Sequence, residues 1–196
     1  MVRGFVSLFS TRLLVLMAVL GGWQAAQAAT LYEFRGDALD AKHAASAEVR
    51  LSLLGLSDDG QNQAIVQAYK DFLTQQDGSA LDKAIQEQQS QGYLFTKAAA
   101  GYSVKYAWQD PNNADRIVLL VTPALKTRNP YLWKTPNTSD MPFSLVELRK
   151  QGEEITMKTS LDAAVEVNDL GQLQLDDYES SDTFATLKEH RSYARN

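Results

Sequence analysis

Few residues of this chain belong to the types that usually carry out chemistry. It contains no cysteine and only two histidines, His43 and His190. A Ser-His-Asp triad would need one of them as its general base, and such a base must be held rigidly. His43 lies among small and polar residues and His190 in the polar C-terminal residues, so neither position predicts that role. The chain also lacks G-x-S-x-G, H-E-x-x-H, Walker and G-x-G-x-x-G motifs. We therefore expect no catalytic triad, no metal and no cofactor.

Glu147 and Arg149 form the first candidate site. They lie two residues apart in an expected strand, so both side chains point to the same side of it. A carboxylate next to a cation could be the acid of a hydrolase centred on Glu147. The more common structure is a salt bridge, and both alternatives stay open on the sequence alone.

A second group of carboxylates lies near the C-terminus. Its members are Asp176, Asp177, Glu179 and Asp182. Ca²⁺ prefers such oxygen ligands, but the spacing lacks the Asp-x-Asp-x-Asp-Gly loop pattern. A solvated acidic surface is the favoured interpretation.

The stretch from Gly101 to Val121 predicts a hairpin that other elements must cover. Its first half alternates apolar and polar residues, which indicates a strand with one buried face. The apolar set, expected on one side, is Tyr102, Val104, Tyr106 and Trp108. The segment 110–115 has turn chemistry, and 117–121 is an apolar run typical of a strand buried on both faces. The tyrosines and Trp108 are candidate ligand-binding residues, although packing against covering elements is the favoured role.

Two helices are expected over residues 57–77 and 79–92. The first has N-cap candidates at Ser57 and Asp58, and both have a narrow apolar stripe. The stripe residues include Tyr69, Phe72 and Ile85. We expect this pair to cover one face of a sheet, over the aromatic side of the hairpin.

The remaining segments predict strands and turns. Residues 31–34 could form an edge strand, 37–47 a loop and 48–56 a strand. Alternation over 143–149, 155–161, 164–167 and 173–175 predicts an antiparallel meander. Residues 179–196 are expected to be a polar, frayed or loosely docked tail.

A proline-rich span, 122–142, predicts a long surface loop. It contains Tyr131, Leu132 and Trp133, which could tuck beneath the loop or contact something outside. Tucking is favoured, because exposed aromatic clusters are uncommon on monomers. Trp133 is kept as a candidate ligand-binding residue.

The N-terminal segment, 1–28, has the order of a secretory signal. Two arginines are followed by an apolar run that is too short to span a bilayer, and then by a small-residue ending at Ala28. Cleavage would leave 17 basic and 24 acidic residues, a net charge of −7. Such an acidic chain argues against nucleic-acid partners and against a stable membrane anchor after cleavage. We expect a periplasmic or secreted bacterial protein.

The order of several short motifs resembles a group of small exported bacterial proteins whose activity is unknown. The motifs are Gly78-Ser79-Ala80-Leu81, Gly101-Tyr102, Arg116 to Thr122, and Pro142 to Arg149, and the likeness covers about 49–178. Where that group often continues with Asp-Arg-Pro-Ile, this chain has Pro123-Ala124-Leu125. The resemblance implies export and a common fold, and it brings no activity with it.

Together these patterns predict one α+β domain over residues 29–178. Its antiparallel sheet is a meander that could curl toward a sandwich or an open barrel, with a two-helix insertion on one face. The preferred function is non-enzymatic binding of a small molecule or a protein partner, as an envelope-associated or secreted domain. The alternative is the hydrolase centred on Glu147.

Overall fold

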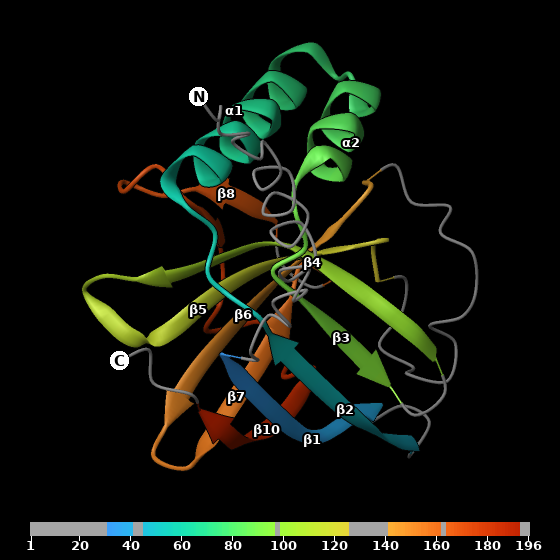
Figure 1. The fold of residues 1–196 in the computed structure, drawn as a ribbon, viewed down its shortest axis with the longest axis vertical. Helices are drawn as coiled ribbons and strands as arrows, with labels where there is room; N and C mark the ends of the chain where they lie inside the picture. Colours follow the sequence, from blue (N-terminus) through green and yellow to red (C-terminus); the bar gives the residue numbers. More distant parts are fainter. Residues whose placement is uncertain (1–30, 41–44, 97–98, 126–140, 162–163, 193–196) are drawn as a thin grey trace, which may run out of the picture.

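Eight antiparallel strands close into a barrel in the computed structural model, which describes residues 31–40, 45–96, 99–125, 141–161 and 164–192 (Figure 1). Around the barrel, each strand pairs with the next barrel strand along the chain, and the last pairs with the first. The strands are β1 (Tyr32–Asp40), β2 (Ala45–Leu53), β3 (Gly92–Thr96), β4 (Ala99–Asp110), β5 (Asn113–Thr122), β6 (Ser144–Gln151), β7 (Glu154–Thr159) and β10 (Ala185–Ser192). The predicted antiparallel, β-rich domain is confirmed, and the meander is a closed barrel rather than an open one.

Two excursions leave the barrel. Helices α1 (Asp59–Gln75) and α2 (Gly78–Glu87) lie between β2 and β3, which confirms the predicted two-helix insertion. Strands β8 (Val165–Val167) and β9 (Leu173–Leu175) lie between β7 and β10 and pair only with each other. The expected continuous meander is therefore interrupted here by a separate hairpin.

Apolar side chains fill the barrel interior. Every barrel strand contributes to this cluster, including Phe34, Val49, Leu119, Met157 and Leu187. The burial follows from strand alternation, because every second residue of a barrel strand points inward. In β5 both sets of side chains are buried, as the apolar run predicted, because its outer face is covered as well.

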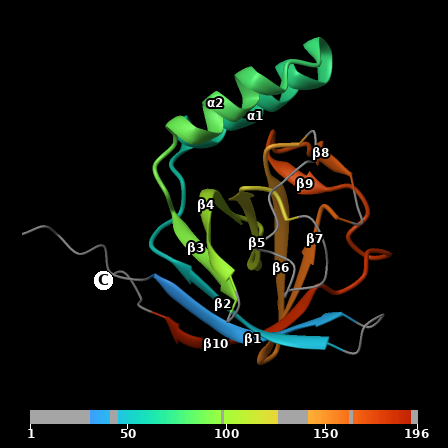
Figure 2. The ribbon, with the colours of Figure 1, turned by 90° about the vertical axis from the view of Figure 1, so that its right-hand side faces the viewer.

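The helices and β9 form a second apolar layer against the outer wall of β4, β5 and β6. Figures 1 and 2 show both helices at one end of the molecule, on the side where β8 lies. Helix α1 begins at a capping box in which the Asp58 side chain accepts from the Gln61 N–H and the Gln61 side chain from the Asp58 N–H. Its buried face includes Ile65, Val66 and Tyr69. Among the described residues, neither helix is long and apolar enough to cross a membrane.

The prediction that the aromatic residues of β4 share one side of the strand is wrong. Val104 pairs with Val121 and Tyr106 with Leu120, so Lys105 is an extra residue in the β4 strand. Such a bulge reverses the side to which later residues point. Tyr102 and Val104 consequently lie inside the barrel, whereas Tyr106 and Trp108 lie in the outer layer.

Closure of the barrel also corrects both ends of the domain. Strand β1 pairs with β2 on one side and β10 on the other, so it is not an edge, and it extends through part of the expected loop 37–47. The expected tail 179–196 contains β10, whose Ala185 and Leu187 are buried in the interior. Pairing on both sides satisfies the backbone of β10 despite its polar composition. Strand β3, in turn, had no counterpart in the sequence prediction.

Some expectations concern residues outside the described ranges. These are the signal segment 1–28 and, in the proline-rich span, Leu132 with the aromatic residues Tyr131 and Trp133.

Candidate functional site

Glu147 is fully buried and is held by two arginines. Arg116 Nε donates to Glu147 Oε1 over 2.8 Å and Arg116 Nη2 to Oε2 over 3.2 Å. Arg149 Nε also donates to Oε1, over 3.0 Å, and the N–H of Leu175 approaches Oε2 at 3.5 Å. Glu147 is 0% exposed, so both of its oxygens are enclosed by donors of the protein itself.

The network continues from Arg116 to two further elements. Arg116 Nη1 donates to Asp110 Oδ2 at the end of β4, over 3.2 Å, and Nη2 donates to Gln174 Oε1 on β9, over 3.0 Å. Burial alone would lower the pKa of Arg116, but its hydrogen bonds to Glu147 and Asp110 raise that pKa above its ordinary value. The network thus ties β9 to the barrel wall.

A second tie lies just after β9. Lys158 Nζ donates to the carbonyl oxygens of Tyr178 and Glu179, over 2.6 and 3.2 Å. The Arg149 guanidinium carbon lies 3.6 Å from the centre of the Tyr178 ring, a cation–π contact. Burial raises the pKa of Tyr178 to about 12. The acidic residues of this region therefore sit on a segment anchored by basic side chains.

These contacts describe a structural role for the candidate carboxylates. Glu147 has two basic partners and no exposed surface, so its oxygens are not available to a substrate in this arrangement. The more C-terminal acidic residues are not brought together as ligands either. Within the described ranges, no three His, Cys, Asp or Glu side chains are grouped so as to hold a metal ion.

The aromatic candidates are packed rather than open. Tyr102 is 4% exposed inside the barrel, where burial raises its pKa to about 12. Tyr106 is fully buried under the second layer, and its hydroxyl donates to Gln172 Oε1 over 2.9 Å. Trp108 lies in the same layer with the Arg116 guanidinium 5.8 Å from its ring.

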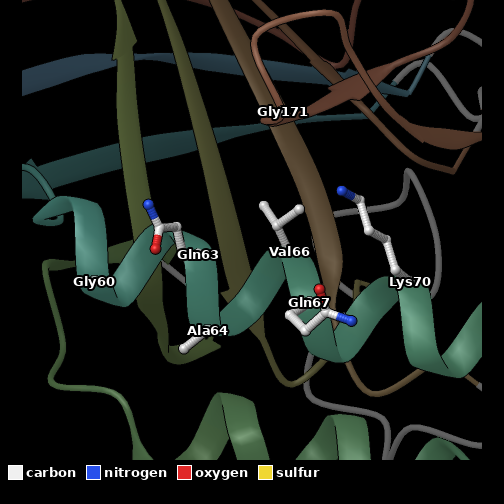
Figure 3. A pocket seen from close by; sticks show the side chains of 7 residues that line it. All are labelled: Gly60, Gln63, Ala64, Val66, Gln67, Lys70 and Gly171. Carbon is white, nitrogen blue, oxygen red and sulfur yellow. The ribbon is translucent and has the colours of Figure 1, made fainter.

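An open groove lies between α1 and the turn that joins β8 to β9 (Figure 3). Its volume is about 570 Å³. The lining residues are Gly60, Gln63, Ala64, Val66, Gln67, Lys70 and Gly171. Figure 3 shows the side chains of Gln63, Val66 and Lys70 extending from α1 toward the side where Gly171 lies. No sequence signal marked this groove, because a polar helix face is ordinarily a solvent face.

Two buried tyrosines hold the walls of the groove in place. The Tyr69 hydroxyl on α1 donates to the Val165 carbonyl of β8 over 2.7 Å, which joins one wall to the other. The Tyr106 hydroxyl fixes Gln172, directly after Gly171. Within the turn, Asn168 Oδ1 accepts from the Leu170 and Gln172 N–H groups. The groove is therefore preorganised.

The groove lining combines amide, cationic and apolar groups. Gln67 Nε2 donates to Asp71 Oδ1 over 2.8 Å, which leaves Gln67 Oε1 as an acceptor. No carboxylate of the described residues pairs with Lys70, which is exposed. Val66, 4% exposed, provides an apolar floor. The groove therefore offers amide and ammonium groups beside a small apolar surface.

Comparisons of the chain with protein-family models, with curated proteins and with solved structures found no match in any of the three. The function must therefore be inferred from the geometry of the molecule.

Proposed function

We propose that the protein is a non-enzymatic binding protein that holds a small molecule, or a short segment of a partner, in the groove between α1 and the β8–β9 turn. The observation that carries this proposal is the direct hydrogen bond between the two walls, from Tyr69 to Val165. A groove whose walls are tied in advance loses little conformational freedom when a ligand enters, so more of the interaction energy appears as affinity.

The burial of Glu147 supports binding over the hydrolase alternative. A general acid or nucleophile must reach the substrate, but both Glu147 oxygens already accept hydrogen bonds, from Arg116 and Arg149. A carboxylate paired with basic neighbours is the arrangement expected of a structural residue.

We further propose that this binding takes place in the periplasm or outside the cell. The support is the order of charged, apolar and small residues in 1–28. Protein isolated from the cell envelope should begin at or near Ala29 on N-terminal sequencing, and a start at Met1 would contradict export.

A thermal-shift screen with metabolites, sugars and short peptides tests the groove. A ligand that binds only the folded state raises Tm. Gln63 is exposed in the groove, so Gln63→Trp should block it, whereas Gln86→Trp places the same side chain on the exposed surface of α2, outside the groove lining.

We expect at least one compound that raises Tm of the natural protein and of Gln86→Trp but not of Gln63→Trp. A compound that stabilises all three equally would place the binding site elsewhere. A screen in which no compound raises Tm would count against a small-ligand function.

A further inference from the structure

We propose that the ligand of this groove is extended and peptide-like, with amide groups along its length and a carboxylate that lies at Lys70. This inference rests on the proposed binding function. It adds the chemical class of the ligand and its direction in the groove.

The length of the groove favours an extended ligand. Its lining on α1 runs from Gly60 to Lys70, and ten residues of helix rise about 15 Å. An extended chain spans about 3.3 Å per residue, so about four residues match that length. A compact ligand such as a single small acid would leave most of the lining uncovered.

The polar groups along the groove match peptide bonds. Gln63 and Gln67 lie four residues apart, one helical turn, on the same side of α1. Each presents an amide oxygen that can accept a hydrogen bond. The NH₂ group of Gln67 already donates to Asp71, whereas Gln63 also offers its NH₂ group as a donor. At Gly171 an added Cβ would meet nothing within 4 Å, so a ligand can approach the backbone of the turn closely.

The cationic side chain of Lys70, at one end of the groove, determines which way the ligand runs. Among the described lining residues, only Lys70 is charged. Lys83, by comparison, lies 3.9 Å from Glu87. A carboxylate at Lys70 would complete an ion pair that the described part of the protein leaves open. Because the chain is acidic overall, this attraction must be local rather than a general field.

The test uses three probes: N-acetyl-tetraalanine with a free carboxylate, the same peptide as its C-terminal amide, and acetate. Binding is measured by titration calorimetry on the natural protein and on three variants, Lys70→Gln, Lys83→Gln and Gln63→Trp. An exposed ion pair contributes modestly, so the acid should bind about two- to fivefold more tightly than the amide.

We expect this preference in the natural protein and in Lys83→Gln, and its loss in Lys70→Gln. Gln63→Trp should weaken both peptides. Equal affinity for acid and amide, or a preference that survives Lys70→Gln, would overturn the carboxylate at Lys70 while groove binding stands. Acetate as tight as the peptide acid, or no binding of either peptide, would overturn the peptide-like ligand. Only the Gln63→Trp screen described above decides whether the groove binds ligands at all.

Discussion

The carboxyl group of Glu147 belongs to a type that is common in active sites, but here it has a structural role. Two guanidinium groups and the backbone of β9 surround it, and no part of it reaches solvent. Removing one partner of a buried ion pair leaves the other charges without compensation, which is far more costly than the loss of an exposed pair.

The first prediction follows from that difference. Glu147→Gln should lower the free energy of unfolding by about 3 kcal/mol or more, because Arg116 and Arg149 lose their shared counter-charge. Glu179→Gln is the matched control, since Glu179 pairs with the same Arg149 but its side chain is 83% exposed. That control should change the free energy by less than about 0.5 kcal/mol. Equal losses in urea titrations would show that the network around Glu147 is not a structural tie.

Tyr102 supports a prediction about alkaline pH. Burial raises its pKa from 10.0 to about 12, so the folded state holds the phenolic proton more tightly than the unfolded state does. The stability that this provides is complete below pH 10 and is lost as pH rises from 10 to about 12. Tyr102→Phe cannot ionise, so its free energy of unfolding should fall less between pH 8 and pH 11 than that of the natural protein. An identical fall would mean that Tyr102 ionises as readily in the folded protein as in the unfolded chain.

At the scale of elements, periodicity predicted the local structure better than the pairing. The two helices expected over 57–77 and 79–92 are present as α1 and α2, although α2 ends at Glu87 and Gly92 already belongs to β3. The chain reverses within the expected turn 110–115, but β5 begins at Asn113, and the run 117–121 is buried as expected, because each of these features rests on neighbouring residues. The bulge at Lys105 does not show in the alternation of apolar residues. It depends on which residues of β5 face β4, and that is a long-range choice.

The groove escaped prediction for a related reason. Lys70 and Gln63 are ordinary residues of a polar helix face, and Gly171 is an ordinary turn glycine with φ +72°. They line one groove only because the β8–β9 hairpin leaves the meander and packs beside α1. The anchors that bring it there, Tyr69 and Tyr106, looked like core residues in the sequence.

The hydrogen bond from Tyr69 to Val165 gives a prediction at this scale. Tyr69→Phe keeps the apolar contacts but leaves the Val165 carbonyl without its donor, which should cost about 0.5 to 1.5 kcal/mol. Amide hydrogen exchange should speed up in β8 and β9 more than in the barrel strands. Tyr93→Phe is the control, because Tyr93 lies in β3 and is 39% exposed. If exchange became faster throughout the protein, or did not become faster in the β8–β9 hairpin, the hydrogen bond would not be a local tie.

At the scale of the whole molecule, the sequence predicted the fold class but not the closure of the sheet into a barrel. An antiparallel sheet with a two-helix insertion follows from periodicity and from the order of elements. Closure depends on β1 and β10, which lie at opposite ends of the described chain and pair over seven positions from Tyr32 to Ala38. Their polar composition predicted an edge strand and a tail. That prediction failed because a strand whose backbone is paired on both sides can tolerate polar outward residues such as Lys188.

If closure holds the barrel together, its last strand should be indispensable. Removal of residues 184–196 takes Phe184, Ala185 and Leu187 from the interior and exposes the paired edges of β1 and β7. Loss of two large buried side chains alone costs several kcal/mol, comparable with the whole stability of a domain, about 5 to 15 kcal/mol. The truncated protein should lose its cooperative urea transition and its near-ultraviolet circular dichroism.

The control removes only residues 193–196, which follow the last registered pair of β10, and it should unfold cooperatively like the natural protein. Because β10 is held by non-covalent contacts, namely backbone pairing, apolar packing and the Lys150–Glu189 ion pair, a synthetic peptide of residues 184–196 should restore the near-ultraviolet signal of the truncated protein in a concentration-dependent way. A truncated protein that still unfolds cooperatively without the peptide would show that β1 and β7 can close the barrel themselves, and that β10 is the docked tail its composition indicates.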